Sequence, residues 1–264
     1  MTEPILKETV DEHGVMTLTL NHVPTRNALT GNGLAEALLD AFARIETTPE
    51  IKVLVLTAQG KVFSSGGSFN EMARQIKPEV QSTALRQEYR HGIQRLPLAL
   101  YQLEIPTIAA VNGLAIGAGC DLACMCDIRI AAQTASFAES FVKVGIIPGD
   151  GGAWFLPRII GMARAVEMSM TGEPVDASTA LAWGLVSQVV PDTHLMDTAL
   201  GLAHKMTNTS SDVIRMTKRL LREGQHASLA NLLELSAAYQ AIAHKTPEHA
   251  AIVNAFMARK SQKK

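Results

Sequence analysis

The stretch that decides the fold is residues 106–131, PTIAAVNGLAIGAGCDLACMCDIRIA. It opens with a short apolar run typical of a buried strand and then turns through glycines at residues 112–119. Residues 120–126 have helical character, and residues 128–132 form another apolar run. A buried strand, a helix and a second buried strand in this order indicate a parallel sheet covered by helices.

The same alternation of strands and helices extends along the first two thirds of the chain. Outside that stretch we expect strands at residues 15–20 and 51–57, and helices at residues 33–45 and 79–103. A Pro/Gly loop at residues 145–152 then leads into helices at residues 157–171, 177–183, 192–207, 212–223, 229–244 and 247–260. We therefore expect an α/β core over residues 1–195 and a C-terminal helical region over residues 196–264.

The composition is that of an ordinary globular protein, with 47% hydrophobic and 19% charged residues and a net charge of −1. This charge predicts no attraction to nucleic acid or to an acidic membrane surface. The N-terminal residues lack the apolar segment of a secretory signal, and no run of eighteen apolar residues predicts a membrane span. Three cysteines, Cys120, Cys124 and Cys126, predict buried free thiols, no metal site and a cytoplasmic protein.

Two segments place glycine-rich backbone directly after an apolar run. The first is residues 63–69, FSSGGSF, and the second is residues 117–121, GAGCD, which opens a helix. Small residues let a ligand approach the backbone, and free N–H groups at a helix start favour negative charge. Two such segments facing one another would form an oxyanion hole. The alternative interpretation is that both segments are only tight turns.

The acidic residues near these segments are Asp121, Asp127, Glu139 and Asp150. Asp121 lies in the first turn of the expected helix, where it either complements the helix dipole or acts beside the oxyanion donors. Asp150 lies between glycines, which is typical of a turn residue. We expect Asp127 to satisfy local backbone groups and Glu139 to lie at the surface. Dinucleotide-binding, P-loop, nucleophile-elbow and HExxH motifs are all missing.

At these residues the chain resembles the crotonase, or enoyl-CoA hydratase/isomerase, family. The resemblance covers roughly residues 5–260. It is carried by residues 27–29 and 63–72, by residues 106–131, by KVGIIPGDGGAWFLPRIIG at 143–161, and by TGEPVDASTALAWGLVSQVV at 171–190. It implies an α/β fold, a crotonase-like spiral of ββα units with a C-terminal helical trimerisation region. It also implies a homotrimer or a dimer of trimers, an acyl-CoA thioester substrate and no permanently bound cofactor.

The resemblance also assigns roles to residues of this chain. Gly67 and Ala118 match the two oxyanion N–H donors, and Ala28 matches the segment whose backbone meets the adenine of coenzyme A. Ser68 stands where an aspartate is common. The residues expected to contact coenzyme A or the substrate are Ala28, Ser65, Gly67, Ser68, Phe69 and Phe141. Lys260 is expected near the phosphates of a neighbouring subunit's coenzyme A.

The departures from the family pattern concern the acids. Hydratases of the family carry two glutamates that hold the attacking water, and these positions fall on Asp121 and Phe141. Phenylalanine cannot transfer a proton, so paired acid–base hydration loses one partner. Some isomerases and dehalogenases of the family carry an aspartate one position before Asp150. The resemblance therefore makes Asp121 and Asp150 the expected catalytic residues.

These observations leave several functions open. The leading one is an enzyme that stabilises a thioester enolate and then hydrates or shifts a double bond. Hydrolysis, dehalogenation or C–C cleavage of an acyl-CoA is the second, with Asp150 as base or nucleophile. The third is a weakly catalytic protein that binds coenzyme A or RNA, and the near-neutral charge argues against RNA. The identity of the acyl group stays open.

Overall fold

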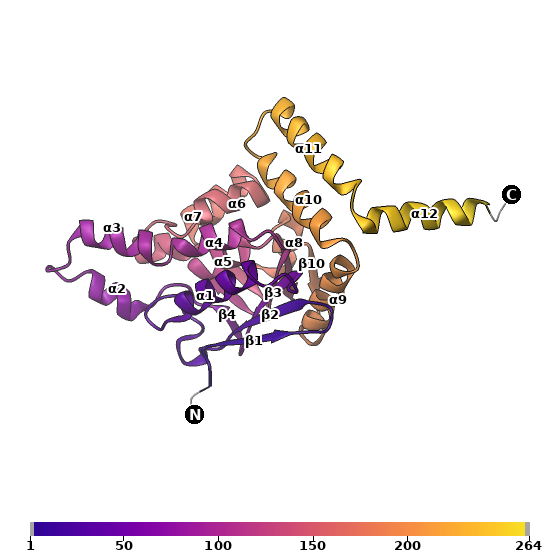
Figure 1. Ribbon diagram of the computed structural model, residues 1–264. Coiled ribbons are helices and arrows are strands. Elements are labelled where there is room, and N and C mark those ends of the chain that lie inside the picture. The colour runs from indigo at the N-terminus through magenta and orange to yellow at the C-terminus, as the bar shows by residue number, and fades with distance from the viewer. Residues whose placement is uncertain (1–2, 262–264) are drawn as a thin grey trace.

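The computed structural model describes residues 3–261 and contains an α/β core from which helices project at two ends (Figure 1). A six-stranded sheet forms the centre. Its spatial order is β1 (Leu6–Val10), β2 (Val15–Leu20), β3 (Val53–Ala58), β5 (Thr107–Val111), β7 (Ile128–Ala132) and β10 (Gln188–Val190). Only β1 runs antiparallel to its neighbour. The middle strands β3 and β5 are buried along their whole length, which explains their unbroken apolar sequence.

A second, four-stranded sheet carries the two glycine loops. Its order is β4 (Val62–Ser64), β6 (Leu114–Ile116), β8 (Ser136–Ala138) and β9 (Val175–Asp176). Strands β4, β6 and β8 are parallel, and β9 pairs antiparallel with β8. The interpretation of residues 112–119 as a turn was wrong in its centre, because β6 lies there. Strands of two or three residues are too short to show a sequence period.

Helices cover both sheets. All eight residues of α5 (Ala118–Met125) are buried, and α5 contacts β4, β6, α4 (Arg95–Gln102) and α6 (Gly152–Ile160). On the large sheet, α9 (Leu195–Thr207) packs against β3, β5 and β7. The remaining core helices are α1 (Leu34–Glu46), α2 (Phe69–Gln75), α3 (Ser82–His91), α7 (Met162–Thr171) and α8 (Ala177–Trp183). The helix expected at residues 157–171 is two helices, because Gly161 separates α6 from α7 with a φ of 79°.

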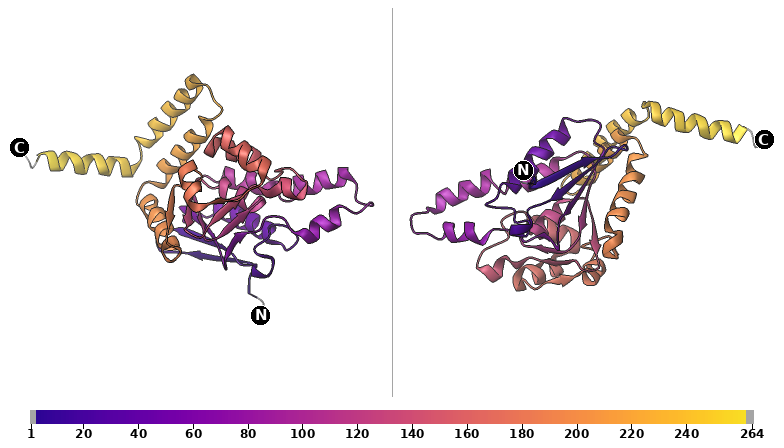
Figure 2. Two further views of the ribbon diagram at one scale, coloured as in Figure 1. Left: turned by 180° about the vertical axis from the view of Figure 1, so that it is seen from behind. Right: turned by 90° about the horizontal axis from the view of Figure 1, so that it is seen from below.

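The chain ends in three helices, α10 (Ser211–Glu223), α11 (Leu229–Ala243) and α12 (Pro247–Ser261). Helix α10 lies against the core, where the Lys218 ammonium donates to the carbonyl oxygen of Ile105, while α11 and α12 project away from it (Figure 2). Neither α11 nor α12 buries a residue. Their exposed side chains include the large apolar residues Leu229, Leu233, Ile252 and Phe256. The expected boundary at residues 195/196 falls at the start of α9. Within residues 3–261, no helix is both long and apolar enough to cross a membrane.

Candidate active site

The two glycine loops leave the same edge of the small sheet. The pairing of β4 with β6 is parallel, so the loops after Ser64 and after Ile116 emerge side by side. Gly66 has a φ of 80° and Gly117 a φ of 52°, a region that side chains disfavour. These two glycines turn the chain out of each strand and into α2 and α5.

The loops touch one another through their backbones. A Cβ on Gly66 would overlap the carbonyl oxygen of Ile116 and would lie 3.1 Å from the nitrogen of Ala118. On the other side, a Cβ on Gly119 would overlap the carbonyl oxygen of Ser64. The close contact of the two loops therefore needs glycine at both positions.

Two backbone N–H groups at this contact have no protein partner. Within the described part of the chain, no acceptor is hydrogen-bonded to the N–H of Gly67 or to that of Ala118. Ala118 is the first residue of α5, so its N–H lies at the positive end of the helix dipole. This arrangement suits a developing negative charge on an oxygen.

A cavity of about 210 Å³ opens at Gly67. Four of the residues predicted to bind substrate or to act on it line the cavity: Gly67, Ser68, Phe141 and Asp150. The rest of the lining mixes apolar side chains with polar and charged ones. It comes from the loop before α1 and the first turn of α1, from α2 and α3, and from Gly92, Ile93 and Ile146. Glu71, Arg74 and Glu88 form ion pairs at this lining.

The other predicted binding residues lie outside this lining. Ala28 is buried beside it, and the Ser65 hydroxyl donates to the carbonyl oxygen of Thr25. Phe69 is 72% exposed at the start of α2. Lys260 lies on α12, far along the projecting helices (Figure 1). Roles for these four residues in binding coenzyme A stay predictions.

Asp150 is a buried acid that lines the cavity, which the less buried Glu36, Glu71 and Glu88 also line. It is 5% exposed, and its Oδ1 has no hydrogen-bond partner among the described residues. Burial raises its pKa to about 6. The loop that holds it is fixed by Gln94, whose amide donates to the carbonyl oxygen of Gly149 at 2.9 Å. Tyr89 packs against the same glycine, and burial together with the charge of Asp150 raises the pKa of its phenol.

Two further carboxyls lie behind the cavity, on Asp121 and Glu139. Their exposed fractions are 0% and 1%, and neither residue lines the cavity. The expectation that Glu139 lies at the surface was wrong. Glu139 follows the buried Phe137 of β8 by two residues, and this strand spacing was the signal that could have placed it inside.

The environment of these two carboxyls favours their neutral forms. Burial and the neighbouring Glu139 raise the pKa of Asp121 well above its usual range. Burial also raises the pKa of Glu139, to about 7. Among the described residues no cation forms an ion pair with Asp121, Glu139 or Asp150. Nor do the described residues include a group of three or more metal-binding side chains.

Phe141 stands where the resemblance places the second hydratase glutamate. Its ring lies 3.6 Å from the position of a Cβ on Gly117 and forms part of the cavity wall. The glycine loop after β6 therefore faces an aromatic ring at this point. Asp150, nine residues further along the chain, presents the carboxyl to the cavity instead.

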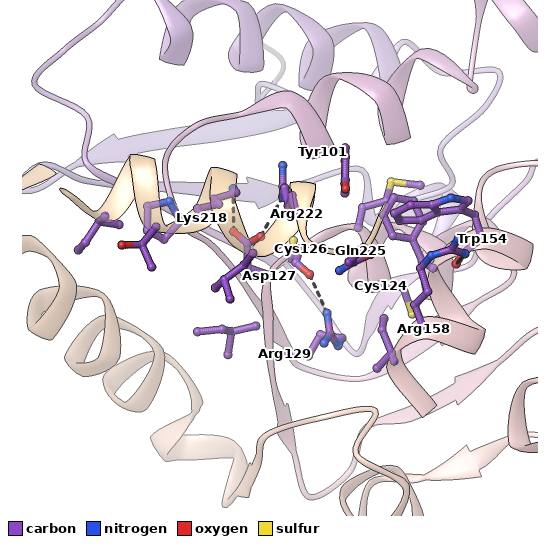
Figure 3. A pocket seen from close by; sticks show the side chains of 18 of the residues that line it. Tyr101, Cys124, Cys126, Asp127, Arg129, Trp154, Arg158, Lys218, Arg222 and Gln225 are labelled. Atoms are coloured by element: carbon purple, nitrogen blue, oxygen red, sulfur yellow. Dashed lines mark hydrogen bonds and ion pairs between the residues drawn. The ribbon is translucent and has the colours of Figure 1, made fainter. Parts of the chain in front are cut away.

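A larger hollow of about 520 Å³ lies elsewhere, between α5, α6 and α10 (Figure 3). Asp127 lines this hollow and forms ion pairs with Lys218 at 2.7 Å and Arg222 at 2.8 Å. It also accepts the N–H of Thr107, which confirms the expected contact with local backbone. None of the glycine-loop residues or acids of the first cavity lines this hollow.

Comparison with known proteins shows the family to which the chain belongs. The family model described as enoyl-CoA hydratase/isomerase matches residues 11–262. The 1,2-epoxyphenylacetyl-CoA isomerase of Escherichia coli is 35% identical, over 95% of this chain and 94% of its own. The 2,3-dehydroadipyl-CoA hydratase of the same organism is 35% identical, over 94% and 93%. A crystal structure of a putative enoyl-CoA hydratase/isomerase from Mycobacterium abscessus superposes with a TM-score of 0.90, at 31% identity and 96% coverage of both chains.

Proposed function

Because the chain belongs to the enoyl-CoA hydratase/isomerase family, we propose that it binds an acyl-CoA, holds its enolate with two N–H groups and moves a proton with Asp150. The two donors are the N–H groups of Gly67 and Ala118. One observation carries the proposal: Gly67 and Asp150 line a single cavity at the contact of the two glycine loops.

The chemistry follows from the charges that develop. The thioester oxygen gains negative charge when a proton leaves the acyl chain, and the two N–H groups stabilise that charge. The carboxylate of Asp150 takes the proton and returns it to another carbon, which shifts the double bond. With a water in the cavity, the same groups support its addition across the double bond instead.

Of these two outcomes we favour the shift of a double bond. Hydration by the family's usual route uses two acids that hold one water. Here Phe141 presents no acid, and Asp121 and Glu139 lie outside the cavity lining. A proton shift needs only one carboxyl that returns its proton, and Asp150 is that carboxyl.

The substrate class follows from the lining. Met72, Ile93, Phe141 and Ile146 make the acyl side apolar. We assign the cavity to an apolar unsaturated acyl group, and the segment of Ala28 and Ser65 to coenzyme A. The two E. coli proteins above are named as an isomerase and as a hydratase, so both reactions occur among relatives of this chain.

The projecting helices fit a role in assembly. Since α11 and α12 bury no residue, their exposed apolar side chains need a partner. We propose a homotrimer, or a dimer of trimers, in which these helices contact neighbouring subunits. Light scattering of the full chain should give the mass of three or six copies, and a monomer would contradict this assignment.

A panel of enoyl-, dienoyl- and hydroxyacyl-CoA esters, analysed by mass spectrometry in D₂O, tests the reaction. A shifted double bond leaves the heavy-atom composition unchanged and incorporates deuterium into the acyl chain. Hydration adds the mass of one water, and hydrolysis releases free coenzyme A. Asp150→Asn should abolish turnover while binding of the ester survives, with Asp40→Asn on the exposed face of α1 as control. Full activity of Asp150→Asn would refute the proposal.

A further inference from the structure

Three carboxyls are buried at or behind the cavity, and none forms an ion pair with a cation among the described residues. Asp121 comes from α5, Glu139 from the residue after β8, and Asp150 from the loop before α6. All three carry unpartnered oxygens within the described structure, and only Asp150 lines the cavity. Nothing derived above gives Glu139 a role.

Asp121 and Glu139 converge on the start of α6. A Cβ on Gly152 would overlap Oδ1 of Asp121 and would lie 2.9 Å from Oε2 of Glu139. An oxygen of each carboxyl therefore approaches the same point at Gly152. A carboxylate accepts but cannot donate, so this contact is favourable only when at least one of the two is protonated.

Few other titratable groups face the pair. They are the thiols of Cys120 and Cys124 on α5, both buried, and Asp150 itself. Asp150 in turn faces Tyr89 of α3. No Lys, Arg or His of the described residues forms an ion pair with any of the three acids. The protonation of the pair is therefore set by the two carboxyls themselves and by burial.

We propose that Glu139 is a positioning residue: burial without a paired cation keeps Glu139 and Asp121 protonated, so that a neutral acid pair lies behind Asp150 while Asp150 ionises as the base. A charged pair would place negative charge beside the carboxylate that has to form at the cavity. The inference rests on the proposed function through Asp150 alone.

The order of ionisation agrees with this arrangement. The pKa of Asp150 rises to about 6, and burial is the cause. That of Glu139 rises to about 7, and that of Asp121 lies well above its usual range, in both cases with burial as the first cause. Asp150 has the lowest of these pKa values, so it is the first of the three to ionise as the pH increases.

Amide variants separate this role from a purely structural one. In Glu139→Gln the new amide donates to Asp121 and stabilises its carboxylate, and Asp121→Asn does the same for Glu139. Each single variant should move the acid limb of α-proton exchange to higher pH, by roughly one pH unit or more. The double variant Asp121→Asn/Glu139→Gln restores a neutral pair of similar shape and should return the acid limb to its original pH.

Infrared pH-difference spectra of the substrate-free protein give a readout independent of activity. At pH 6.5 the wild type should show protonated carboxyl bands that each single variant diminishes and the double variant lacks. An ionised pair in the wild type, or a double variant shifted further than the singles, would overturn the inference and leave the proposed function standing. The expected bands together with an unimpaired Asp150→Asn would instead refute the proposed function and leave the neutral pair standing.

Discussion

Replacing Asp150 with asparagine should stabilise the fold while it removes proton transfer. Burial raises the pKa of Asp150 from 3.8 to about 6, so the folded protein holds this proton more tightly than the unfolded chain. The folded state therefore loses stability as the pH rises from about 4 to 6, and the loss is complete above pH 6. With ~1.4 kcal/mol for each tenfold change in proton affinity, the loss is on the order of 3 kcal/mol.

Asparagine has no proton to lose, so Asp150→Asn should recover part of this free energy of unfolding. We expect the free energy of unfolding at pH 7.5 to increase by about 1–3 kcal/mol. The increase is smaller than the full loss because an unpartnered buried amide is itself destabilising. Below pH 4 the gain should vanish, since Asp150 is protonated there in both states. The same variant should lower kcat by ~10²–10⁴-fold, the range of a general acid–base residue.

Urea unfolding at pH 7.5 and at pH 4, followed by circular dichroism at fixed protein concentration, measures the effect. Asp40→Asn, on an exposed face of α1, is the control and should change neither stability nor turnover. Equal destabilisation of Asp150→Asn at both pH values would refute the reasoning from burial. Unchanged kcat would refute the catalytic assignment.

Two further substitutions test the packing behind the site. Gly152→Ala should destabilise the protein and lower its melting temperature, because the new methyl group overlaps Asp121. Gly201→Ala should instead stabilise the protein by ~0.5–1 kcal/mol, because Gly201 lies in α9 with no neighbour within 4 Å of the new Cβ. Thermal unfolding compares the pair, and equal melting temperatures would contradict the placement of Asp121. Lys218→Met should cost on the order of 3 kcal/mol, since Asp127 keeps only Arg222 as a cation; urea unfolding that matches the wild type would contradict a structural role for this ion pair.

The long apolar strands and the amphipathic helices could be predicted from the sequence. The runs at β3, β5 and β7 are continuous because both faces of those strands are buried. The helical spacing likewise predicted α1 and the C-terminal helices. The short strands of the small sheet could not be found, because three residues define no period, and β6 was interpreted as part of a turn.

The glycine loops of the candidate site could be predicted from the sequence, because their shape depends on backbone conformation alone. Glycines at residues 66 and 117 are needed for turns and close contact, and these needs are local in sequence. The carboxyl pair was not predictable, because Asp121 and Glu139 meet at Gly152 only after three segments fold together. Sequence could name Asp150 as an acid of the loop, but only the fold shows that it faces the cavity.

Deuterium exchange at the α-carbon of a bound acyl-CoA, measured for Ala118→Pro, tests the oxyanion donors most directly. Proline is well tolerated at the first position of a helix and removes the N–H in question. We predict an exchange rate lowered by ~10²–10³-fold, the usual effect of losing one oxyanion donor, with helix content unchanged. Ala118→Gly keeps the N–H and should exchange within a few-fold of the wild type. Exchange by a folded Ala118→Pro at the rate of Ala118→Gly would contradict the enolate-stabilising role of this N–H.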